Sequence, residues 1–141
     1  MERTRTTLMV IDTMVFVYAL LRVESQHEQA LSALERAEQI IVPDSFFAEL
    51  GNVVWQWIVF RQLPLTIGLE VLKDAESLVT KIIPVIDIRD TALELAVQKN
   101  HSFYDAVFVA AAIQEQVQVI TFDRKFAEKF SDRVQLLPSA F

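Results

Sequence analysis

Four acidic residues stand where a short apolar run gives way to a helical pattern, and side chains of this type in this position could do chemistry. They are Asp12, Glu49, Asp105 and Asp123. If the apolar runs are parallel strands, all four carboxylates gather at one edge of the sheet, where open α/β folds place their sites. Clustered carboxylates repel one another unless a positive charge lies among them. Because the chain offers oxygen ligands and contains no cysteine, the pattern favours Mg²⁺ or Mn²⁺.

The composition excludes several other kinds of site. Without cysteine there is no disulfide scaffold, thiolate zinc site or cysteine nucleophile. His27 and His101 are too few for a multi-histidine metal centre, and Gly51 and Gly68 cannot form a glycine-rich phosphate loop, so a nucleotide cofactor is not expected. The net charge of −6 argues against nucleic-acid binding through a broad basic face. Acids gathered around a metal ion would contribute to that charge, and the ion could itself recruit phosphate.

The chain is unusually apolar, with 52% hydrophobic residues and a mean hydropathy of +0.31. No unbroken apolar stretch is longer than that of residues 106–113, which is far short of the roughly 20 residues that a membrane span requires. Residues 1–7 are polar and are not followed by the apolar core of a signal peptide. We therefore expect a cytoplasmic protein without a membrane span, and an apolar surface that a partner covers.

Strand and helix patterns alternate along the whole chain. Strands are expected at 8–11, 39–43, 82–86, 117–122 and 133–137. Helices are expected at 13–22, 27–37, 45–61, 66–80, 89–99, 103–116 and 124–130, with Asp44 and Ser45 as N-cap candidates for the third. Pro84 within the third strand suggests an edge position in the sheet. The 141 residues thus predict one α/β domain, 1–141, that is large enough for a full hydrophobic core.

Each of the three aspartates also has a purely structural explanation. Asp12 and Asp123 follow strands directly and could be the N-caps of the next helices, since Asp accepts hydrogen bonds from the first free amides there. Ser102 and Asp105 have the spacing of a capping box. Capping explains each aspartate locally, but it does not explain why all of them should reach the same edge of the sheet.

Glu49 is harder to explain by local structure alone. It lies in a strongly apolar helical segment, where a charged side chain must either reach solvent or find a partner. The alternative is that it belongs to a narrow polar stripe together with Asn52 and Gln56. Glu49 therefore supports the hypothesis that all four carboxylates form one site.

Four segments of the chain resemble, in order and spacing, the conserved blocks of PIN-domain nucleases: 10–20, 43–54, 102–112 and 119–126. The resemblance covers nearly the whole chain, and the length is similar to that of the VapC-like toxins of toxin–antitoxin pairs. It implies a single PIN-like domain with a three-layer α/β/α architecture, in which helices flank a small parallel sheet. It also implies metal-dependent hydrolysis of phosphodiester bonds in RNA by an endoribonuclease, and an antitoxin protein as a possible partner.

The four acids match the family's acidic quartet. The resemblance also implies supporting roles for Thr13, which matches the small hydroxyl residue after the first acid, and for Thr121, which matches the threonine two residues before the last acid. The chain departs from the pattern at Met14, where the family commonly has asparagine. Methionine cannot form the hydrogen bonds of an amide, and partners of metal ligands are worth about 10 to 100-fold in affinity or activity. We therefore expect Met14 to affect the level of activity and not the fold.

Hydrolysis of a phosphodiester needs an activated water, neutralisation of the growing phosphate charge, and help for the leaving oxygen, and carboxylate-held Mg²⁺ can supply all three. Asp12, Asp105 and Asp123 are assigned as metal ligands, direct or through water. Glu49 is assigned as a ligand or as the base that orients the water. The basic residues beside the last two acids could hold RNA phosphates, although solvated surface charge is the favoured explanation for each taken alone: Lys99, His101, Arg124 and Lys125.

Two other functions remain as alternatives. The first is a non-catalytic or weakly active PIN-fold binding protein, which Met14 and the acidic composition favour. The second is an acid-based phosphotransfer enzyme or receiver domain with Asp12 as nucleophile. The sequence disfavours the second, because no second aspartate lies two residues after Asp12 and no acidic pair precedes it. A metal titration of RNA cleavage separates the first alternative from a nuclease.

The segment 51–60 combines many apolar residues with two tryptophans. Trp55, Trp57 and Phe60 cannot all face one core, because residues two apart on a helix point to different sides. The helix is either buried among neighbouring helices or forms a surface for a second copy or an antitoxin segment. We expect a homodimer, since burying even ~400 Å² at about 25 cal/mol per Å² is worth about 10 kcal/mol before the costs of association.

Overall fold

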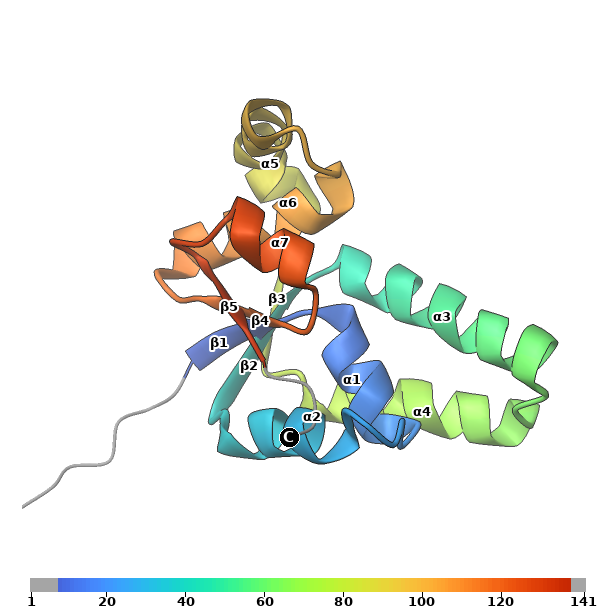
Figure 1. Ribbon diagram of the computed structural model, residues 1–141. Coiled ribbons are helices and arrows are strands. Elements are labelled where there is room, and N and C mark those ends of the chain that lie inside the picture. Colours follow the sequence, from blue (N-terminus) through green and yellow to red (C-terminus); the bar gives the residue numbers. More distant parts are fainter. Residues whose placement is uncertain (1–7, 138–141) are drawn as a thin grey trace, which may run out of the picture.

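A five-stranded, wholly parallel sheet forms the centre of the computed structural model, which describes residues 8–137 (Figure 1). The strands run in the order β3-β2-β1-β4-β5. Their bounds are β1 Leu8–Ile11, β2 Gln39–Pro43, β3 Lys81–Ile83, β4 Val119–Thr121 and β5 Val134–Leu136. The helices between them are α1 Thr13–Leu20, α2 His27–Arg36, α3 Ser45–Arg61, α4 Leu65–Leu78, α5 Val85–Lys99, α6 Phe103–Glu115 and α7 Arg124–Lys129.

Helices cover the sheet on both faces, which confirms the predicted three-layer α/β/α architecture. On one side α6 packs on β1, β2 and β4, and α5 packs on α6. On the other side α1 and α2 pack against each other, and α3 contacts both α1 and α4 (Figure 1). Residues 106–112 of α6 are all buried. This apolar stretch therefore forms the central helix of one layer, since a helix that is apolar all round must be buried.

The direction of the chain across the sheet reverses beside β1. From β1 it moves outward through β2 and β3, and it then crosses to β4 and β5 on the other side. The crevice at such a switch point, beyond the carboxyl ends of the strands, is where open α/β sheets bind their ligands. Ile11 pairs with Ile120 in the register of β1 and β4, and the backbone N–H of Asp12 donates to the Ile120 carbonyl at 3.0 Å. Asp12 therefore leaves the sheet at the switch point.

The predicted elements are found, but the boundary after the third strand is wrong. The strand predicted at 82–86 ends at Ile83, and the helix predicted to begin at 89 begins at Val85. Pro84 is the N-cap of α5 with φ −64°, and the backbone N–H of Val85 donates to Asp44 Oδ1 at 3.0 Å. Pro84 thus precedes a helix and does not lie within a strand, although β3 is indeed at the edge of the sheet. Asp44 stands at the N-cap position of α3, but its carboxylate bonds α5 instead.

The segment 51–60 within α3 is not buried between neighbouring helices. Val54 faces the core, but Trp55 is 52% exposed and Phe60 is 71% exposed. Their rings meet edge to face with centroids 6.0 Å apart. Trp57 is half-buried, with the Arg61 guanidinium 4.5 Å from its ring centroid. Of the two interpretations of this segment, the structure therefore favours an exposed apolar surface.

No helix within residues 8–137 is both long and apolar enough to cross a membrane. The expectation drawn from residues 1–7 concerns a part of the chain outside the described residues.

Candidate active site

One cavity of about 400 Å³ opens at the carboxyl edge of the sheet beside the switch point, and all four predicted acids line it. Each comes from a different element. Asp12 follows β1, Glu49 lies in the second turn of α3, Asp105 lies in the first turn of α6, and Asp123 follows β4. The complete lining is Asp12, Thr13, Met14, Tyr18, Glu49, Val53, Asp105, Phe122 and Asp123.

Asp12 is held by hydrogen bonds to both of its carboxylate oxygens. The backbone N–H of Thr13 donates to Oδ1 at 2.8 Å, which makes Asp12 the N-cap of α1. The hydroxyl of Thr121 donates to Oδ2 at 2.6 Å and accepts the backbone N–H of Asp123 at 3.0 Å. Because the amide of Asp123 must donate, the Thr121 proton is directed to Asp12. Asp12 thus caps α1 and lines the cavity at the same time.

Glu49 faces the cavity and does not belong to a polar surface stripe. Asn52 and Gln56 are exposed, whereas Glu49 is half-buried. Its Oε1 accepts a hydrogen bond from the Thr13 hydroxyl at 3.3 Å. Its Oε2 is buried and makes no hydrogen bond of normal geometry among residues 8–137, although the nearby Ser45 hydroxyl lowers the pKa of Glu49 slightly. A buried carboxylate oxygen without a partner is costly, so this atom is suited to a proton, a water or a cation.

Burial and mutual repulsion raise two of the carboxyl pKa values. Burial raises the pKa of Asp12 to about 6; the charges of Asp105 and Asp123 add to the rise, and the bonds from Thr121 and Thr13 partly offset it. Burial, followed by the Asp12 charge, raises the pKa of Glu49 to about 7. Raised carboxyl pKa values in a cavity are typical of functional sites.

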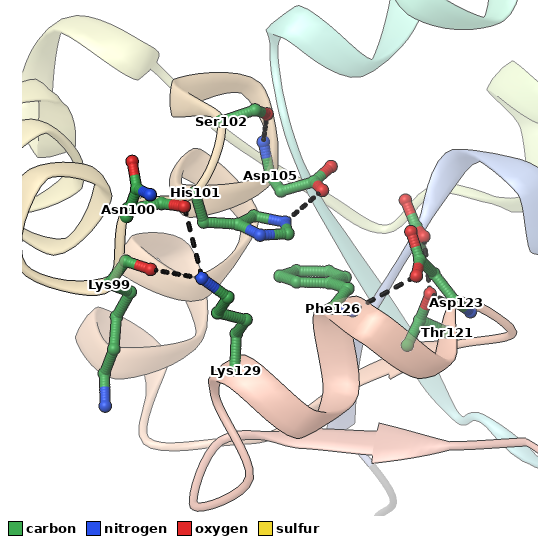
Figure 2. A network of polar contacts seen from close by, with 10 residues as sticks. Lys99, Asn100, His101, Ser102, Asp105, Thr121, Asp123, Phe126 and Lys129 are labelled. Atoms are coloured by element: carbon green, nitrogen blue, oxygen red, sulfur yellow. Dashed lines mark hydrogen bonds and ion pairs between the residues drawn. The ribbon is translucent and has the colours of Figure 1, made fainter.

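Asp105 and Asp123 occupy the starts of two helices on the more open side of the cavity. The backbone N–H of Asp105 donates to Ser102 Oγ at 3.2 Å, so Ser102 caps α6. The Asp105 carboxylate does not bond back to Ser102 and lies 2.7 Å from His101 Nε2 instead (Figure 2). Asp123 caps α7 by accepting the backbone N–H of Phe126 at 3.1 Å. The predicted capping box is therefore only half made, which leaves the Asp105 carboxylate for another use.

The four basic residues that were predicted to hold phosphates lie in different surroundings. Arg124 and Lys125 are exposed in the first turn of α7, directly after Asp123. His101 contacts Asp105. Lys99 is exposed, and its side chain extends away from Asp105 in Figure 2. Of the four, Arg124 and Lys125 follow a cavity acid in the chain and are open to solvent.

Sequence reasoning missed three residues of the cavity wall. Tyr18 and Phe122 meet edge to face with centroids 5.2 Å apart, and Val53 lies one helical turn after Glu49. Helical spacing could have indicated Tyr18, because Met14 and Tyr18 are four residues apart and therefore share one face of α1. Both are half-buried, whereas the other face of this helix is buried. The Met14 thioether thus stands in the wall where an amide would offer hydrogen bonds.

The cavity is not a closed metal cage as it stands. Within residues 8–137, no group of three or more acidic, histidine or cysteine side chains is arranged to hold a metal ion directly. The four carboxylates surround a space that has room for water between them. Mg²⁺ commonly keeps several waters and binds proteins through only one or two carboxylates.

Comparison with known proteins finds the same fold. The family model described as PIN domain matches residues 9–129. Ribonuclease VapC3 of Pyrobaculum aerophilum is 27% identical over 133 residues, covering 81% of this chain and 88% of that protein. The structure of VapC20 from Mycobacterium tuberculosis, a sarcin-ricin loop cleaving toxin, superposes with a TM-score of 0.71 at 16% identity and covers 94% and 100% of the two chains. VapBC2 from Rickettsia felis, bound to a promoter DNA fragment, gives 0.66 at 18% identity and covers 94% and 100%.

Proposed function

The chain belongs to the PIN-domain family, and on that premise we propose that it is a metal-dependent endoribonuclease, the toxin component of a toxin–antitoxin pair. The observation that carries the proposal is the single cavity lined by four acids from four different elements at the switch point of the sheet. The similarity to a protein named Ribonuclease VapC3 supports RNA as the substrate.

The donor atoms of the cavity fit Mg²⁺ or Mn²⁺. The acids that line it offer only oxygen, which these hard cations prefer. Glu49 Oε2 is a buried oxygen without a hydrogen bond of normal geometry within residues 8–137, and the pKa values of Asp12 and Glu49 are raised. A cation would relieve both conditions. We assign Asp12, Asp105 and Asp123 as ligands, direct or through water, and Glu49 as a ligand or as the base.

In the proposed mechanism each group of the chain has a defined task. A cation held by these carboxylates would supply a water of lowered pKa and would neutralise charge on the phosphate. Thr13 and Thr121 each donate a hydrogen bond to one oxygen of Asp12. These bonds fix the orientation of the carboxylate, so that its remaining lone pairs are available to a cation. Glu49 lines the cavity beside Asp12 and would accept a proton from water as the general base. Arg124 and Lys125, which are exposed directly after Asp123, are assigned as the contacts to RNA phosphates.

The test is cleavage of single-stranded RNA by the purified chain with Mg²⁺ or Mn²⁺ and with EDTA. Asp12→Asn should lower cleavage by at least about 100-fold, the upper end of what loss of an outer-shell partner costs. Asp44→Asn is the matched control, because Asp44 also follows a strand but bonds α5 and does not line the cavity. It should cleave like the parent.

Two results would refute this mechanism: undiminished cleavage in EDTA, or undiminished cleavage by Asp12→Asn. A parent that binds RNA but does not cleave it with either metal would support the alternative, a non-catalytic PIN-fold binding protein. Met14 is the observation that favours this alternative, since it brings a thioether to the cavity wall.

We further propose that the exposed apolar surface of α3 and α4 is covered by a second copy of the chain, and that an antitoxin protein is the other partner. The homodimer rests on a set of exposed side chains on these neighbouring helices: Trp55, Val59, Phe60, Leu65, Ile67 and Leu69. The antitoxin is supported by structural neighbours described as toxin–antitoxin complexes.

Sedimentation tests the homodimer. The parent should sediment as a dimer at micromolar concentration, and Phe60→Glu should sediment as a monomer. Leu93→Glu is the control, because Leu93 is similarly exposed at 57% but lies on α5. A monomeric parent at high micromolar concentration would exclude the dimer, and dissociation by Leu93→Glu alone would place the interface on α5.

A further inference from the structure

His101 contacts an acid of the cavity from behind. It lies in the three-residue connection between α5 and α6, directly after Asn100, which caps the end of α5 in the left-handed conformation with φ 50°. Its Nε2 is 2.7 Å from Asp105 Oδ2, and its side chain is only 13% exposed (Figure 2). Because a carboxylate oxygen accepts hydrogen bonds, Nε2 must be the donor. His101 is also not among the residues that line the cavity.

The ring of His101 is held in place by α7. It stacks on Phe126 with centroids 5.6 Å apart and an angle of 11° between the planes, and it meets Phe130 edge to face at 5.7 Å. Phe126 and Phe130 are themselves buried and in edge-to-face contact. Lys129 Nζ, between them in sequence, donates to the carbonyl of Lys99 at 2.8 Å and to that of Asn100 at 3.3 Å. Both the ring and the backbone just before it are therefore fixed to α7.

The same helix fixes the other open carboxylate of the cavity. The ring of Phe126 supports His101, while the backbone N–H of Phe126 donates to Asp123 Oδ1 at 3.1 Å (Figure 2). His101 and Phe126 thus connect the two acids, Asp105 and Asp123. The contacts that hold the link are an aromatic stack and two hydrogen bonds, each of which depends on direction.

We propose that His101 is a positioning residue, whose Nε2–H sets the orientation of the Asp105 carboxylate relative to Asp123. A ring that only filled space could be replaced by any aromatic ring, whereas a donor aimed at a carboxylate requires a nitrogen at that point. The proposal rests on the proposed metal-dependent function, because the orientation matters only if both acids serve one ion. Outer-shell partners of this kind are worth about 10 to 100-fold in metal affinity or activity.

Two variants separate the donor from the ring. His101→Phe retains an aromatic ring against Phe126 but has no donor, whereas His101→Gln places an amide N–H near the position of Nε2. We expect His101→Phe to lower kcat for single-stranded RNA by about 10 to 100-fold with KM changed less than about 2-fold, as for an interaction that does not bind substrate. Mn²⁺ affinity, measured by calorimetry without RNA, should fall about 10-fold. His101→Gln should recover most of both losses.

The outcomes distinguish this proposal from the function on which it rests. If the parent binds Mn²⁺ but does not cleave RNA, the proposed nuclease function is refuted. The Mn²⁺ affinities of the two variants would still test the positioning role of His101. If His101→Phe matches the parent in kcat and Mn²⁺ affinity, His101 is only a packing residue. If KM alone rises, it is a phosphate contact.

A measurement on the parent protein does not depend on the folding of any variant. Nitrogen-15 NMR of the histidine rings should show a proton on His101 Nε2 at neutral pH. An Nε2 without a proton would overturn the proposal, since that atom could then not donate to Asp105.

Discussion

The two halves of the cavity hold their carboxylates by different physical means. Asp12 and Glu49 lie half-buried on one side, where threonine hydroxyls donate to them and burial raises the pKa of each. Asp105 and Asp123 lie at helix starts on the more open side, where His101 and the backbone of α7 hold them. The half with Asp12 and Glu49, here called the closed half, holds two carboxylates whose charged forms are destabilised, and a cation can relieve this destabilisation. The half with Asp105 and Asp123, here called the open half, is followed in the chain by exposed basic residues that can attract a phosphate.

The largest effect on stability is expected in the closed half. The folded-state pKa values of Asp12 and Glu49 lie above their ordinary values of 3.8 and 4.5. Their contribution to the stability of the metal-free protein is therefore fully present below about pH 4, and it is lost as the pH rises through about 6 and 7. Asp12→Asn should raise the free energy of unfolding by about 2 kcal/mol at pH 8 and by much less at pH 4. Glu49→Gln should act in the same direction.

Urea unfolding in EDTA at the two pH values measures this difference. Asparagine retains an oxygen that can accept the hydrogen bond from Thr13 or Thr121, so most of the local structure should be kept. A variant that is less stable than the parent at pH 8, or one whose gain is the same at both pH values, would contradict the electrostatic description of the closed half.

A smaller effect is expected for the matched change in the open half. Asp123 is exposed, and asparagine is as good an N-cap as aspartate. Asp123→Asn should therefore unfold within about 0.5 kcal/mol of the parent at both pH values, while its RNA cleavage falls as that of Asp12→Asn does. If Asp123→Asn stabilised the protein as much as Asp12→Asn, the distinction between the two halves would disappear.

The sequence predicts the α/β layers and the convergence of the four acids because both follow from local patterns. Short apolar runs that alternate with helical periods specify parallel strands, and parallel strands place their carboxyl ends at one edge. Asp12 and Asp123 each follow a strand, so their convergence needs only the topology.

The features that the sequence does not predict depend on contacts between distant residues. The true start of α5 depends on a hydrogen bond from Val85 to Asp44, 41 residues earlier. The contact of His101 with Asp105 could have been suspected from the sequence, since the two residues are only four positions apart. Its aromatic support from Phe126 becomes apparent only when α7 folds against the connection between α5 and α6.

The central claim is that both halves of the cavity serve one divalent cation, and anomalous diffraction from crystals soaked in Mn²⁺ tests it most directly. We expect an anomalous peak in the cavity, about 2 Å from an oxygen of Asp12 or Glu49 or from a water that they hold, and similarly close to Asp105 or Asp123. A peak bound only outside this cavity, or no peak at Mn²⁺ concentrations that support RNA cleavage, would contradict the claim.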